Sequence, residues 1–276
     1  MGKKRNCIVI IAFIVLIFLI VWCYMFPYIK TASLCESIKN GSREETVDMV
    51  NKMKDVNRAS SPAFLRKVYN VLGYDIELPL VVACKNGDYE MVKLLLEKGA
   101  DPNKYLEENW SAVEATCLNG NKDRFRILKL LLEYGADVNL HSSDTSALFY
   151  ELQNLIYKDN IAPDEKMIFE ETIMLLLENG AKIIDGKGDT IIHYLAFANE
   201  ISMLKKIVPE YSTLINSSNI QGETPLIWAV EGEATLSVEY LLSIGAEKDI
   251  ITDAGKTALD YAKEKNNKAI ILFLTN

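Results

Sequence analysis

The chain is poor in histidine, cysteine, glycine and proline, and each shortage excludes a class of protein. Two histidines among 276 residues leave little for a histidine-rich metal site. Five cysteines are too few for a disulfide-dense mini-domain, and 14 glycines with 7 prolines exclude collagen-like and low-complexity chains. The remaining composition, 49% hydrophobic and 25% charged, is that of a globular protein, except that its apolar residues are unevenly spread.

Acidic side chains outnumber basic ones outside the first 30 residues. The formal net charge is −8, yet residues 1–30 hold four basic and no acidic side chains, so residues 31–276 carry −12. Binding to nucleic acid phosphates needs a basic surface, which this acidic body does not offer. We therefore expect no nucleic acid partner, and a protein partner that is basic or neutral.

Residues 7–26 form a run of 20 residues without a single charge. As a helix this run would be about 30 Å long, which matches the hydrocarbon core of a bilayer. Basic residues 3–5 precede it, and an aromatic cluster that suits the membrane interface ends it: Trp22, Tyr24, Phe26 and Tyr28. We predict an uncleaved, single-pass transmembrane helix that ends at Pro27.

A cleaved signal peptide and a buried core helix are the alternatives. The apolar run exceeds the usual 7–15 residues of a signal peptide, no small-residue cleavage site follows it, and Asn6 breaks the myristoylation pattern. The basic flank predicts a cytoplasmic N-terminus and places residues 31–276 on the extracytoplasmic side. Cys84 and Cys117 argue against an extracytoplasmic location of the repeats, because they resemble the reduced thiols of a protein core.

The body of the chain repeats itself. Gly-Ala-Asp-x-Asn occurs at residues 99–103 and 135–139, which lie 36 residues apart. Thr190, Thr224 and Thr257 open similar hexapeptides, spaced by 34 and 33 residues. A fixed period of this length is typical of stacked repeat proteins.

These motifs resemble the ankyrin-repeat family, whose marks are a 33-residue period and a Thr-Pro-Leu-His-x-Ala opening. The resemblance covers nearly all of residues 31–276 and implies an all-α solenoid of six or seven stacked helix pairs. We expect a degenerate first repeat at 31–57, an extra helix at 58–76, and repeats at about 77–105, 109–140, 144–184, 188–220, 222–251 and 255–276.

Helical periodicity agrees with the resemblance. Leu80, Ala83 and Cys84 fall on one face of a first helix, and residues 92, 95 and 96 do the same in a second. No single pair buries enough surface to fold alone, so neighbouring pairs must stack. Glu151 departs from the pattern, because it occupies a small-residue position and must reach either solvent or a partner.

No constellation of residues supports catalysis. The chain has neither a phosphate-binding glycine loop nor a Gly-x-Ser-x-Gly nucleophile elbow. His193 occupies the structural histidine position of the resembled family, and His141 has no nearby ligand at metal spacing. Cys84 and Cys117 stand one repeat apart, which is too far for a disulfide. We expect no enzyme, no cofactor, no metal and no small-molecule substrate.

Two candidate protein-binding surfaces follow from the repeat register. The first is a row of aromatic side chains that would face the concave groove, where ankyrin partners commonly bind: Tyr150, Tyr194, Trp228 and Tyr261. Such a row is also compatible with simple packing between repeats. The second candidate lies at the loop tips, where Tyr105 and Trp110 are the large aromatic residues.

The sequence thus predicts a non-enzymatic interaction scaffold or adaptor held at a membrane. Two alternatives stay open: a structural envelope spacer, and an inhibitor or immunity-type binder of a specific protein. The resemblance specifies the fold without specifying the partner.

Overall fold

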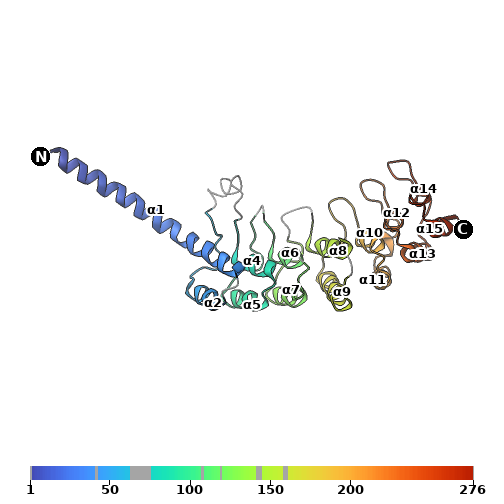
Figure 1. Ribbon diagram of the computed structural model, residues 1–276, viewed down its shortest axis with the longest axis horizontal. Coiled ribbons are helices and arrows are strands. Elements are labelled where there is room, and N and C mark those ends of the chain that lie inside the picture. The colour runs from blue at the N-terminus through green and yellow to red at the C-terminus, as the bar shows by residue number, and fades with distance from the viewer. Residues whose placement is uncertain are drawn as a thin grey trace.

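The computed structural model describes residues 2–40, 43–62, 76–106, 109–118, 120–140, 145–157 and 161–275, with side chains from Val15 onward. In this part of the chain the regular structure is helical, and seven helix pairs stack in one row, the first of which includes the end of a long N-terminal helix (Figure 1). A single β-bridge joins Ile184 to Thr190 within a loop of the described chain. The predicted all-α solenoid is confirmed. Most of the extra helix predicted at 58–76 lies outside the described residues.

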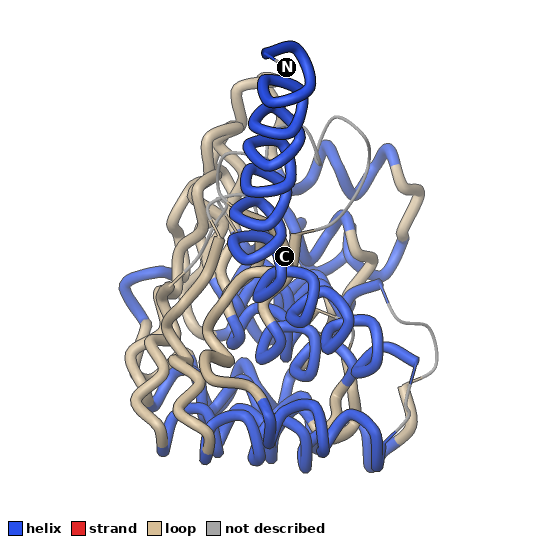
Figure 2. Tube along the Cα trace, turned by 90° about the vertical axis from the view of Figure 1, so that its left-hand side faces the viewer, coloured by secondary structure: helices blue, strands red, loops and turns tan. Residues whose placement is uncertain are grey.

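The helices form two layers, with the connecting loops gathered at one side (Figure 2). The inner layer consists of the second half of α1 (Gly2–Asn40), α4 (Pro79–Asn86), α6 (Ala112–Cys117), α8 (Ala147–Tyr157), α10 (Ile191–Phe197), α12 (Pro225–Glu231) and α14 (Ala258–Glu264). The outer layer consists of α2 (Arg43–Lys52), α5 (Tyr89–Glu97), α7 (Arg124–Glu133), α9 (Pro163–Glu178), α11 (Ile201–Ile207), α13 (Thr235–Ser243) and α15 (Lys268–Thr275). A short 3₁₀ turn, η2 (Ser212–Leu214), follows α11.

Hydroxyl side chains start most of the inner helices. Ser111 accepts a hydrogen bond from the Glu114 N–H, and Thr257 accepts one from the Asp260 N–H. In both helices the acidic side chain in turn accepts a hydrogen bond from the backbone N–H of the capping residue. The two bonds together satisfy two otherwise unpaired backbone donors. These caps explain why the inner helices begin in register with the repeat.

One continuous core runs through all the pairs. The predicted faces are buried, including Leu80, Ala83 and Cys84 on α4. Small residues let neighbouring pairs approach closely: a Cβ added to Gly232 would lie 2.5 Å from the Phe197 carbonyl oxygen, at the contact between α12 and α10. Because each pair contacts only its neighbours, the array is stabilised by stacking.

Asparagine side chains link successive repeats along the loops. Asn103 donates to the Gly135 carbonyl at 2.8 Å and accepts from the Asp137 N–H at 2.8 Å. Asn57 and Asn139 form the equivalent pair of bonds with the turns at residues 99–101 and 180–182. The asparagine of the Gly-Ala-Asp-x-Asn motif therefore forms hydrogen bonds from one repeat to the next, and these bonds set the register between repeats.

The first helix continues through Pro27, so the prediction that Pro27 ends it is wrong. Pro27 lies inside α1, and the Thr31 hydroxyl donates to its carbonyl at 3.0 Å. Proline removes one backbone donor, but the φ angle it imposes is compatible with a helix. Beyond it, Leu34 and Ile38 are buried in the core and hold the helix to Asn40. The apolar segment and the first repeat therefore share one helix.

Candidate protein-binding site

The predicted aromatic row follows the inner helices, but its members differ in exposure and contacts. Tyr194 on α10 is only 7% exposed, whereas Tyr150, Trp228 and Tyr261 are half-buried. The ring centroids of Tyr194 and Trp228 lie 5.2 Å apart. Tyr261 instead lies beneath the Lys256 ammonium, 5.3 Å from its ring centroid. Of the predicted row, the structure therefore brings Tyr194 and Trp228 together.

Tyr194 and Trp228 line an open pocket of about 360 Å³ between α8, α10 and α12. We call it the Tyr194–Trp228 pocket. Its lining is Gln153, Ile156, Tyr157, Lys187, Asp189, Tyr194, Phe197, Asn219, Gln221, Glu223, Trp228 and Glu231. Pockets for drug-sized ligands begin near this volume, so it has room for one long side chain. Tyr150 and Tyr261 are not part of the lining.

Two hairpin loops build the outer edge of the pocket. In the first hairpin the Asp185 N–H donates to the Asp189 carbonyl at 3.0 Å. In the second hairpin the Asn219 N–H donates to the Glu223 carbonyl at 2.9 Å. The Ile220 N–H donates to the Lys187 carbonyl at 3.0 Å and joins one hairpin to the next. Backbone bonds between consecutive repeats therefore hold this edge in place.

Asn219 is the centre of a polar network beneath the pocket. Its Nδ2 donates to Asp189 Oδ1 at 2.8 Å and to Glu223 Oε2 at 3.0 Å. Trp228 Nε1 donates to the same Glu223 oxygen at 3.1 Å, and the Tyr194 hydroxyl donates to Asp185 Oδ2 at 3.1 Å. These bonds fix the orientation of both aromatic rings before any partner arrives.

The pocket is acidic. Three carboxylates line it, from Asp189, Glu223 and Glu231, against the single positive side chain of Lys187. Burial raises the pKa of Asp189 above its ordinary value. Burial and the nearby Glu223 charge raise the pKa of Glu231, while the charges of Lys265 and Lys256 oppose that shift. A positive group placed here would relieve this crowding of negative charge.

The sequence analysis missed most of the polar lining. Asp189, Asn219 and Glu223 lie in loops, where no periodicity predicts the direction of a side chain. Tyr157 could have been found, because it follows Tyr150 by seven residues on α8 and so lies on the same helix face. It is 81% exposed at the pocket edge.

His193 is the hydrogen-bonded structural group that the sequence indicates. Its Nδ1 accepts from the Thr190 N–H at 3.0 Å, and its Nε2 lies 3.0 Å from the Glu223 carbonyl oxygen. Burial lowers the pKa of His193 to about 4. The neutral imidazole therefore connects the start of α10 to the hairpin that carries Glu223. His141 lies outside the described residues.

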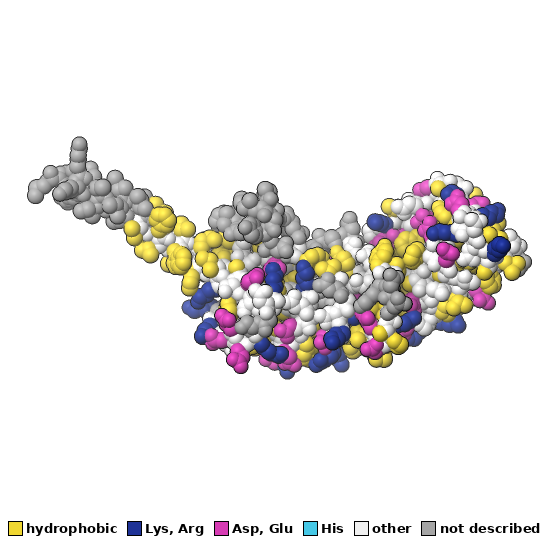
Figure 3. Space-filling view, in the orientation of Figure 1, with side chains coloured by type: hydrophobic (Ala, Val, Ile, Leu, Met, Phe, Trp, Pro, Cys, Tyr) yellow, Lys and Arg dark blue, Asp and Glu magenta, His cyan; other side chains and the backbone are white. Residues whose placement is uncertain are grey.

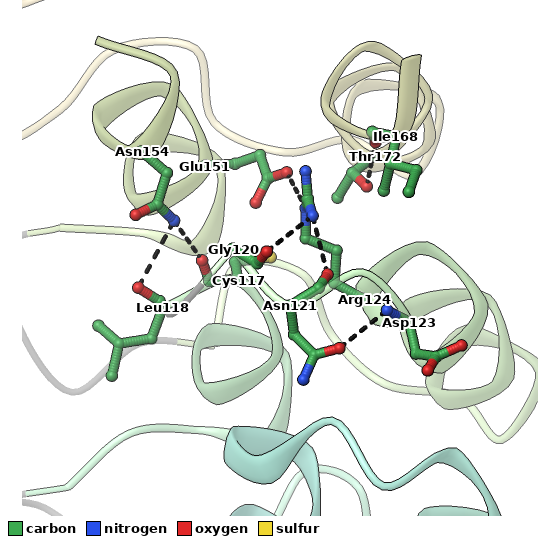
Figure 4. Close-up of polar contacts among 10 residues, drawn as sticks. All are labelled: Cys117, Leu118, Gly120, Asn121, Asp123, Arg124, Glu151, Asn154, Ile168 and Thr172. Atoms are coloured by element: carbon green, nitrogen blue, oxygen red, sulfur yellow. Dashed lines mark hydrogen bonds and ion pairs between the residues drawn. The ribbon is translucent and has the colours of Figure 1, made fainter. Parts of the chain in front are cut away.

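Glu151 finds a partner inside the protein and does not reach solvent. Its side chain and that of Arg124 are both fully buried, with Arg124 Nε 2.5 Å from Glu151 Oε1 (Figure 4). Arg124 also donates to the carbonyls of Gly120 and Asn121 and lies over the Phe169 ring, 4.0 Å from its centroid. Burial raises the pKa of Glu151 to about 7, while Arg124 opposes that shift.

The second candidate surface lies on the loop between α5 and α6. Tyr105 and Trp110 are half-buried, and the Lys85 ammonium lies 4.6 Å from the Trp110 ring centroid. Residues 107–108 between them lie outside the described chain. A shared binding role of Tyr105 and Trp110 stays a prediction.

The described cysteines do not form a metal site or a disulfide. Cys35, Cys84 and Cys117 are buried in the core, and burial raises the pKa of Cys84 to about 12. No group of three potential metal ligands occurs among the residues that the structure describes. The buried thiols therefore serve as small packing residues.

Comparison with known proteins decides the family. The sequence profile described as "Ankyrin repeats (3 copies)" matches residues 63–155 and 192–276, together more than half of the chain. The chain belongs to the ankyrin-repeat family. Ankyrin repeats act in protein–protein interaction, which is the general activity that the fold carries.

Related ankyrin-repeat proteins have varied sizes and roles. Over 202 residues, or 72% of its length, the chain is 27% identical to the ankyrin repeat protein L271 of Acanthamoeba polyphaga mimivirus. It spans only 25% of that protein, and 10% of the human transient receptor potential cation channel subfamily A member 1, to which it is 29% identical over 113 residues.

Two solved structures share the ankyrin-repeat architecture. One is a chain from the complex of the predatory endopeptidase Bd0816 of Bdellovibrio bacteriovorus with the immunity protein Bd3460, with 27% identity and a TM-score of 0.59. The match covers 71% of this chain and 96% of that one. The human ASB11 ankyrin repeat domain, at 21% identity, gives a TM-score of 0.65 over 87% of this chain and 96% of its own.

Proposed function

We propose that this ankyrin-repeat protein is a non-enzymatic adaptor that binds a protein partner across its inner helices and hairpin loops. The observation that carries this proposal is the Tyr194–Trp228 pocket, where aromatic rings held by hydrogen bonds lie beside three carboxylates. Large aromatic side chains in a pre-organised pocket are frequent anchors of protein recognition. The outer layer shows interspersed charges of both signs (Figure 3).

The proposal includes a membrane tether. Among the described residues, the helix Val15–Asn40 is long and apolar enough to cross a membrane. Its side chains from Val15 to Trp22 are 45% to 70% exposed, so the protein core does not cover them. The basic residues at 3–5 favour a cytoplasmic N-terminus and an extracytoplasmic repeat domain. Protease added to intact cells would then remove the repeats, and protection until lysis would reverse this orientation.

Site-specific photo-crosslinking in cells tests the binding role. A photoreactive phenylalanine analogue at Tyr157, at the pocket edge, should capture one stoichiometric partner. The same analogue at Leu236, which is 56% exposed on outer helix α13, is the matched control and should capture none. Equal capture at both positions, or capture at neither, would contradict the proposal and favour a structural envelope spacer.

An inhibitor or immunity-type binder is a second candidate. It is favoured by the likeness to a chain from a complex of an endopeptidase with its immunity protein. The crosslinked partner distinguishes the two roles, because an inhibitor would capture one enzyme and abolish its activity at equimolar concentration. An adaptor would leave the activity of its partner unchanged.

A further inference from the structure

We propose that the Tyr194–Trp228 pocket takes the guanidinium of an arginine side chain from the protein partner. This inference rests on the proposed binding function and names the chemistry that the pocket recognises. The pocket combines aromatic walls from Tyr194, Phe197 and Trp228 with carboxylates from Asp189, Glu223 and Glu231. A planar cation that both stacks on rings and pairs with carboxylates matches this lining.

Glu231 is the carboxylate available to an incoming cation. Glu223 Oε2 already accepts from Asn219 and Trp228, and Asp189 Oδ1 accepts from Asn219. Glu231 lines the pocket and makes no such hydrogen bond among the described residues, and the charges of Lys265 and Lys256 reach it without a direct ion pair. It follows Trp228 by three residues on α12, so the carboxylate and the ring share one helix face. A guanidinium beside Trp228 is therefore within reach of Glu231.

Arginine fits better than lysine for two reasons. Its guanidinium is flat and weakly hydrated, so it stacks on an aromatic ring at lower desolvation cost than an ammonium does. Among the described residues the two shortest distances from a cation to a ring belong to arginine, because Arg124 lies 4.0 Å from the Phe169 ring centroid and Arg126 lies 4.2 Å from that of Tyr89. The acidic lining also suits a basic partner, which is one of the two kinds, basic or neutral, that the net charge of residues 31–276 predicts.

Indole NMR of the full chain in detergent micelles tests the proposal. Selective ¹⁵N-tryptophan labelling gives three indole signals, from Trp22, Trp110 and Trp228, and Trp228→Phe assigns the third. The probe is N-acetyl-arginine methylamide, and its neutral isostere, N-acetyl-citrulline methylamide, is the ligand control. We expect arginine to shift the Trp228 signal alone and citrulline to leave it in place.

Two charge-neutralising variants sharpen the test. Glu231→Gln should raise the Kd for the blocked arginine at least fivefold. Glu239→Gln makes the same change on an exposed residue of outer helix α13 and should leave the Kd within twofold. Equal shifts with arginine and citrulline, blocked lysine binding as tightly as arginine, or an unchanged Kd in Glu231→Gln would overturn the proposal.

The result of the NMR titration can be distinguished from the result of the crosslinking experiment. A partner captured at Tyr157 with the same yield in wild type and Glu231→Gln would overturn the arginine pocket alone. Absence of any captured partner would contradict the binding function, whatever the NMR titration shows.

Discussion

Arg124 and Glu151 form a fully buried ion pair that joins the second and third complete repeats, with Nε and Oε1 2.5 Å apart. Among the described residues, Arg124 Nη2 and Glu151 Oε2 are buried without a hydrogen-bond partner. A buried pair of this kind depends on both members, because either one alone is an unpaired charge in the core.

Arg124→Met should therefore lower the free energy of unfolding by about 3–5 kcal/mol. The double variant Arg124→Met/Glu151→Leu should recover most of this loss, because it replaces the pair with apolar side chains of similar size. Urea titration followed by tryptophan fluorescence measures both effects. A double variant less stable than the single one would show that the pair itself stabilises the stack.

Two asparagines in equivalent loops should differ in their contribution to stability. Asn219 is 8% exposed, and without it the buried Asp189 loses a hydrogen-bond donor. Asn103 makes its two bonds at an exposed position, where water can replace them. We expect Asn219→Ala to cost about 2–4 kcal/mol and Asn103→Ala about 1 kcal/mol. Equal losses in urea titration would contradict the burial argument.

His193 makes stability depend on pH in a known direction. Its pKa is about 4 in the fold, against about 6.5 in an unfolded chain. The unfolded state therefore binds more protons between these values, and stability falls as pH decreases through this window, by up to about 3 kcal/mol.

His193→Gln isolates this effect. Glutamine at the third helical position can still bond to the Thr190 N–H, but it does not titrate. Wild type and variant share all other titrating groups. The difference between their free energies of unfolding should therefore shrink as the pH falls from 7 to 4.5. A difference that stays constant across these pH values would exclude His193 as the source.

The buried thiols should be protected in the folded chain. Burial raises the pKa values of Cys35, Cys84 and Cys117, which suppresses the reactive thiolate at neutral pH. In a Cys7→Ser/Cys23→Ser background, a maleimide should label no cysteine in the folded protein and three after denaturation. Mass spectrometry counts the labels, and fast labelling of any cysteine before unfolding would show that the stack opens locally.

The sequence alone determined the repeat, because a stacked solenoid is local: helix faces, caps and turns recur every 33 to 36 residues. Leu80, Ala83 and Cys84 could be placed in the core from spacing alone. The same register located Tyr194 and Trp228 on the inner helices. It could not show that Tyr194 is buried, since exposure depends on the neighbouring repeats.

Only the tertiary structure decided which contacts are made by the residues that depart from the repeat pattern. Glu151 meets Arg124 across 27 positions of the chain, and Asn219 meets Asp189 across 30. Neither pair follows a helical period, because each joins two different repeats and the stacking of those repeats decides which side chains meet. Pro27 continues a helix that local preference would end, since packing of Leu34 and Ile38 outweighs one lost backbone hydrogen bond.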